Sequence, residues 1–131
     1  MLRLIVGIVI GVVAWFAMVF IVPYLIGFVS PAVNAAMREH HTVVALAERL
    51  GVSFLASLVS GYVAARVAAG SQRAPLIAGI LLLIYFVPYH LFGADMQGVK
   101  VWTSFPLWYH LTFFVSLVVL SVLGGRLARG R

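Results

Sequence analysis

Hydrophobic residues fall into four long runs that are separated by short polar segments. The runs cover residues 4–26, 50–67, 74–92 and 105–123, and their acidic and basic neighbours lie at or beyond the ends of the runs. A helix needs about 20 apolar residues to cross a bilayer, so each run has roughly the required length. The pattern predicts an all-α protein, a four-transmembrane-helix antiparallel bundle.

The polar segment between the first two runs has a helix-start signature. Ser30 is followed by Pro31, and a serine oxygen can cap a helix whose first position is a proline. We expect a short interfacial helix here, leading through Thr42 into the second span. At the other end of the chain, Gly124 and Gly125 follow the fourth run, where glycines are typical helix C-caps.

Composition leads to the same class. The chain has 131 residues, of which 64% are hydrophobic and 9% are charged, and its mean hydropathy is +1.15. A soluble domain of this size carries about 25% charged residues. We therefore expect residues 1–131 to form a single integral membrane domain.

The distribution of charge predicts the orientation of the chain. The N-terminus, the loop after the second span and the C-terminus contain six basic residues and no acid, whereas the other two loops contain three basic residues and all three acids. Basic loops stay in the cytoplasm, which predicts an inner-membrane protein with both termini cytoplasmic. Because the basic residues are scattered, the net charge of +6 indicates no nucleic-acid partner. The six residues are Arg3, Arg66, Arg73, Arg126, Arg129 and Arg131.

Small residues recur on one face of the second span. Such a face lets two helix backbones approach closely, and the first span has a matching pair of glycines four residues apart. We expect the first two spans to pack through these residues, with homodimerisation or a substrate path as alternatives. The packing residues are Gly7 and Gly11 in the first span and Ser53, Ser57, Ser60, Gly61, Ala64 and Ala68 in the second.

All four histidines fall at the predicted outer side. His40 and His41 lie in the polar segment, while His90 and His110 lie near the adjoining ends of the last two spans. A tight loop joins these spans, so we expect a shared cleft that binds a ligand or handles protons. Its candidate residues are His90, His110, Tyr85, Tyr89, Trp108 and Tyr109.

Two other interpretations of this cluster remain open. In the first, the histidines lie at the interface and hydrogen-bond to headgroups, water or carbonyls, while the aromatic rings form a membrane belt. His90 and His110 could instead ligate a metal ion or haem iron. An ionisable group below the interface, as expected for His110, is a functional candidate by default.

No catalytic motif is present, and the chain has no cysteine. We therefore expect a non-enzymatic accessory or interaction subunit without a cofactor, which could form a homo-oligomer or join a larger membrane complex. A small oligomeric transporter or channel is the main alternative, and a metal- or haem-binding membrane protein is the second.

A motif at the end of the second span is followed by a short basic loop and another apolar run. The motif is Ser60-Gly61-Tyr62-Val63-Ala64-Ala65-Arg66-Val67-Ala68. It resembles small, uncharacterised four-helix bacterial membrane proteins, in which Gly-Gly-Tyr usually precedes Ala-Ala-Arg; here Ser60 replaces the first glycine. The likeness covers about residues 53–85. It implies the same four-span architecture and carries no known activity.

Overall fold

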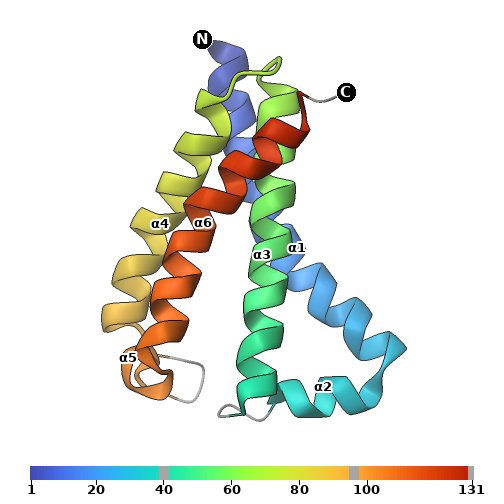
Figure 1. Cartoon of the computed structure of the whole chain (residues 1–131), viewed down its shortest axis with the longest axis vertical. Helices are drawn as coiled ribbons and strands as arrows, with labels where there is room; N and C mark the ends of the chain where they lie inside the picture. Colours follow the sequence, from blue (N-terminus) through green and yellow to red (C-terminus); the bar gives the residue numbers. More distant parts are fainter. Residues whose placement is uncertain (39–41, 95–97, 130–131) are drawn as a thin grey trace.

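The computed structural model describes residues 1–38, 42–94 and 98–129, and these ranges form helices joined by short connections (Figure 1). Glu39, His40, His41 and Asp95 lie outside the described residues. The helices are α1 (Leu2–Val29), α2 (Pro31–Arg38), α3 (Val43–Val67), α4 (Arg73–Phe92), α5 (Val101–Ser104) and α6 (Leu107–Leu127). Within the described ranges, α1, α3, α4 and α6 are long and apolar enough to cross a membrane.

Local sequence signals explain the starts of α2 and α3. The Ser30 hydroxyl accepts a hydrogen bond from the Val33 amide at 3.4 Å, and the Thr42 hydroxyl accepts one from the Ala45 amide at 3.2 Å. Because Thr42 caps α3, this helix begins before the second apolar run and includes Glu48 and Arg49. These two charges, predicted for a loop, therefore lie in the first turns of a long helix.

The α1–α3 contact uses the predicted glycines but only part of the predicted partner face. A Cβ atom at Gly7 would lie 2.7 Å from the carbonyl oxygen of Ala64, and one at Gly11 would lie 2.7 Å from the Ala64 side chain. The expectation that Gly61 also faces α1 is wrong, because a Cβ there would overlap the backbone of Ser121 in α6. The small-residue surface of α3 is wide enough to serve two neighbours.

Gly124 and Gly125 pack against neighbouring helices and do not end α6. Both lie inside α6, which continues to Leu127. A side chain at Gly124 would overlap the carbonyl oxygen of Leu58, and one at Gly125 would overlap the Pro75 ring. These glycines allow close backbone approach, and this packing role replaces the predicted C-cap.

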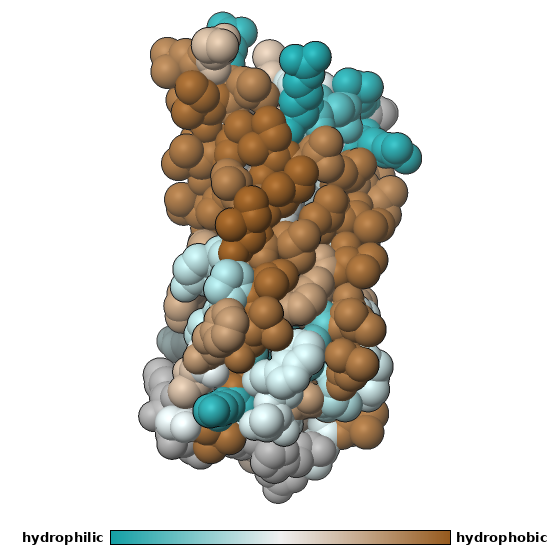
Figure 2. Space-filling model, turned by 90° about the vertical axis from the view of Figure 1, so that its left-hand side faces the viewer, coloured by the Kyte–Doolittle hydropathy of each residue, from teal (hydrophilic) through white to brown (hydrophobic). Residues whose placement is uncertain are grey.

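The helices are closest near the termini and diverge toward the other end. Figure 1 shows both termini at one end, with α1 and α3 separating from α4 and α6 toward α2 and α5. Figure 2 shows an apolar surface over the middle of one face, with hydrophilic side chains gathered at the terminal end. A pocket lies between the diverging helices.

Candidate functional site

A pocket of about 420 Å³ lies between α1, α3, α4 and α6, in the helix halves far from the termini. Its volume is within the usual range for small-molecule sites, about 300–1,000 Å³. Most of its walls are aromatic, and its polar groups come from several helices. The lining residues are Trp15, Phe16, Val19, Phe20, Pro23, Arg49, Val52, Ser53, Tyr85, Phe86, Tyr89, His90, Tyr109 and Phe113.

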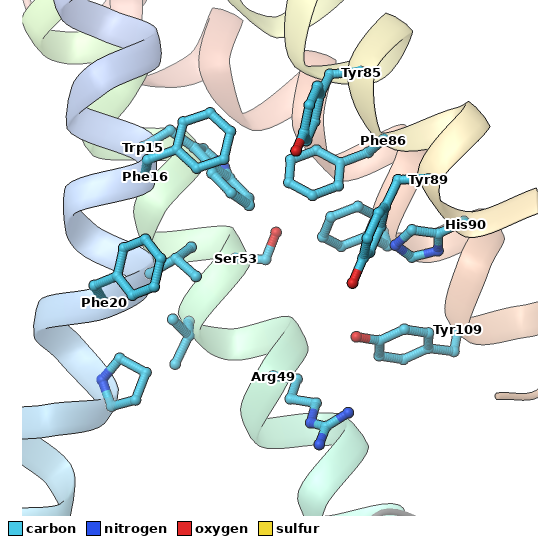
Figure 3. Close-up of a pocket in the computed structure, with 14 residues that line it drawn as sticks. Trp15, Phe16, Phe20, Arg49, Ser53, Tyr85, Phe86, Tyr89, His90 and Tyr109 are labelled. Carbon is cyan, nitrogen blue, oxygen red and sulfur yellow. The ribbon is translucent and has the colours of Figure 1, made fainter. Parts of the chain in front are cut away.

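Ser53 provides a buried hydroxyl that makes no hydrogen bond to the described residues. Its side chain is 3% exposed, and its hydroxyl has no hydrogen-bond partner within the described ranges. Figure 3 shows this hydroxyl directed into the pocket from α3. A buried hydroxyl without a partner costs about 1–3 kcal/mol, and a ligand that bonds to it would recover that energy.

Other polar groups surround the same space. Figure 3 shows the hydroxyl ends of Tyr89 and Tyr109 turned toward the pocket, with Arg49 approaching from α3. The Arg49 guanidinium also lies over the Phe105 ring, 5.3 Å from its centroid. A cation–π contact of this kind holds the guanidinium at the edge of a pocket whose walls are mainly aromatic.

The indole of Trp15 forms the inner wall. Trp15 is 3% exposed, and its Nε1–H donates a hydrogen bond of 3.1 Å to the Ser57 hydroxyl of α3. Its ring packs against Phe86, with centroids 4.8 Å apart, and against Phe16 at 5.3 Å. The hydrogen bond and ring contacts fix the position of this wall.

His90 and His110 lie in direct contact. The Nδ1 atoms of His90 and His110 are 2.7 Å apart, and His110 Nε2 lies 3.3 Å from the Trp102 carbonyl oxygen. His90 is stacked on Phe113 with ring centroids 4.8 Å apart, and His110 is stacked on Trp102 at 4.6 Å. Both imidazoles are buried, and their orientation is fixed by rings and hydrogen bonds together.

The structure brings most of the predicted cleft residues together. Tyr85, Tyr89, His90 and Tyr109 line the pocket, and His110 lies behind His90. Trp108 is not among the lining residues and is 48% exposed. Adjacent residues on a helix point about 100° apart, so burial of Tyr109 turns Trp108 outward.

Sequence reasoning did not predict the pocket wall that α3 provides. It places Arg49 in a loop and Ser53 on the small-residue packing face, although both line the pocket. The four-residue spacing of Arg49 and Ser53 was the available signal, because residues at this separation share a helix face.

The described residues contain no group of three or more His, Cys, Asp or Glu side chains placed to hold a metal ion. His90 and His110 direct their Nδ1 atoms at each other, as hydrogen-bonded partners do. Comparisons with protein-family models, characterised proteins and solved structures found no match. The site itself therefore carries the functional argument.

Proposed function

We propose that this chain is a membrane protein that binds a small amphipathic aromatic molecule in the pocket between α1, α3, α4 and α6. The observation that carries the proposal is the unpartnered, buried Ser53 hydroxyl inside an aromatic pocket. Sites for small organic ligands typically combine apolar and aromatic walls with a few placed polar groups. Such a protein would act as a non-enzymatic binding subunit.

The rim of the pocket supports access from the membrane. Phe20 of α1 is 74% exposed, and Tyr85 and Tyr89 of α4 are 56% and 41% exposed, yet all three line the pocket. Side chains that are both lining and exposed mark a mouth, which here lies between α1 and α4. In a bilayer this mouth would face lipid or the interface, where amphipathic aromatic molecules concentrate.

The proposed orientation places the termini in the cytoplasm and the pocket in the outer half of an inner membrane. Five described basic residues lie at or just beyond the helix ends nearest the termini, where Figure 2 shows hydrophilic side chains. The positive-inside rule assigns that end to the cytoplasm. Helix α2, at the opposite end, would lie at the outer interface. The five residues are Arg3, Arg66, Arg73, Arg126 and Arg129.

Binding can be tested by thermal unfolding of the protein in lipid nanodiscs with 4-pentylphenol or 4-pentylanisole. A ligand at a hundredfold excess over its Kd stabilises the folded state by about 2.7 kcal/mol. We expect at least one of the two compounds to raise the melting temperature, and V19W to abolish the rise by filling the pocket.

V13W is the matched control, because Val13 lies on the same helix, is 60% exposed and is not a lining residue. This variant should keep the ligand-induced rise. Ligand-free melting temperatures of both variants would show that they fold. The proposal is overturned if neither compound stabilises the parent protein, or if V19W responds as V13W does.

A further inference from the structure

The hydrogen bonds of the histidine pair have a direction. A carbonyl oxygen can only accept, so the contact between His110 and the Trp102 carbonyl requires His110 Nε2 to donate. A neutral imidazole has one N–H, which leaves His110 Nδ1 as an acceptor. The donor in the 2.7 Å contact must then be Nδ1 of His90.

This direction fixes the state of the remaining nitrogen. In the neutral pair, the single proton of His90 is on Nδ1, and Nε2 carries an unprotonated lone pair. Within the described parts of the chain, the His90 side chain makes no other hydrogen bond. His90 lines the pocket, and Figure 3 shows its imidazole extending from α4 toward the pocket. The pocket therefore presents a hydrogen-bond acceptor on an aromatic wall.

From this arrangement we infer that the ligand is a phenol-type molecule, an aromatic ring whose hydroxyl donates a hydrogen bond to His90 Nε2. The inference rests on the proposed function and specifies its ligand class. The rings of Trp15, Phe86 and Phe113 suit a planar aromatic body, which can pack face-on or edge-on against them. The Ser53 hydroxyl offers a further contact to a polar substituent of the ring.

Two other ligand types fit less well. An aromatic ether or hydrocarbon would displace water from His90 Nε2 without replacing its hydrogen bond, which leaves a buried acceptor unpaired. An alkyl carboxylic acid could donate to the same nitrogen, but its flexible chain would gain little from aromatic walls and would lose rotational freedom on binding. The ring and the hydroxyl are both needed.

The test compares 4-pentylphenol, 4-pentylanisole and octanoic acid by equilibrium dialysis against nanodiscs, with partition into empty nanodiscs subtracted. Phenol and anisole have nearly the same shape, and only the phenol can donate a hydrogen bond. We expect the parent protein to bind the phenol at least tenfold more tightly than the anisole, equivalent to about 1.4 kcal/mol.

Variants assign the preference to His90. H90F should bind both aromatic compounds with nearly the affinity that the parent has for the anisole, and this retained binding would show that its pocket is folded. W108F should keep the preference, because Trp108 lies outside the pocket. In the parent protein, the ¹⁵N resonance of His90 Nε2 should shift on adding the phenol and remain in place with the anisole.

The outcomes separate the two proposals. Equal affinity for phenol and anisole in the parent, or a preference that survives in H90F, would overturn the inference and leave the binding function standing. Tighter binding of octanoic acid than of the phenol would also overturn it. If none of the three compounds binds, the proposed function itself fails.

Discussion

Gly61 lies at a close contact between the backbones of α3 and α6. A Cβ at this position would overlap the Ser121 carbonyl, whereas a Cβ at Gly51 on the same helix meets nothing within 4 Å. Gly61 is buried and Gly51 is exposed. The two glycines of α3 therefore offer a matched comparison between close packing and intrinsic helix propensity.

We predict that G61A lowers the free energy of unfolding by about 1–3 kcal/mol, because the added methyl group forces α3 and α6 apart. G51A should instead raise it by up to about 1 kcal/mol, since alanine favours a helix over glycine. Unfolding in mixed micelles would measure both values. Equal effects of the two substitutions would show that the Gly61 contact is not close in the folded protein.

For single residues, the sequence predicted which residues pack closely better than it predicted their partners. Small residues at three- and four-residue spacing indicated close packing, and Gly7 and Gly11 lie against α3 in the structure. The partner of Gly61 could not be predicted, because spacing defines a face of a helix but not which neighbour covers it. The histidine hydrogen bond depends on side-chain rotation that no spacing encodes.

Between elements, the hydrogen bond from Trp15 to Ser57 joins α1 to α3 in the apolar middle of the molecule. Interhelical hydrogen bonds in membrane proteins contribute about 0.6 kcal/mol on average and reach about 1.7 kcal/mol. Both partners are buried, so neither can exchange the bond for water. This contact also holds one wall of the pocket.

We predict that W15F and S57A are each destabilising and that their effects are not additive. The double variant should be less destabilised than the sum of the single variants by about 0.6 kcal/mol or more, the coupling free energy of the bond. A double-mutant cycle of unfolding free energies measures this coupling. Strict additivity would mean that the bond contributes nothing to stability.

The long helices were the most predictable elements. Uninterrupted apolar runs placed α1 and α4 within a few residues of their observed ends. The start of α3 was less predictable, because Glu48 and Arg49 reduce hydropathy as loop residues do, although they lie on a capped helix. Hydropathy measures the cost of exposure to lipid, and a charge that lies beside a pocket avoids much of that cost.

For the whole molecule, the charge distribution predicts on which side of the membrane each connection lies. The chain has no cysteine, so single introduced cysteines can test this prediction. We expect S71C, in the connection between α3 and α4, to resist a membrane-impermeant maleimide in intact cells and to react after permeabilisation. T103C, on the exposed surface of α5, should react in intact cells. The reason is that the positive-inside rule favours a cytoplasmic location for the basic helix ends.

Labelling of both variants after denaturation is the control for thiol reactivity. The reverse pattern, in which S71C reacts from outside and T103C does not, would invert the proposed orientation and place the pocket in the cytoplasmic half. Reaction of both variants in intact cells would contradict a four-span arrangement in which the two connections lie on opposite sides.

The divergence of the helices away from the termini gives the molecule a wedge-shaped outline (Figure 1). Placed across a bilayer, a wedge takes up more lateral area in one leaflet than in the other. Drawing the splayed helix ends together around a ligand would return area to the lipids of the wider leaflet. The work of such a closure would depend on the lateral pressure in that leaflet, so the affinity for a ligand would change with membrane tension.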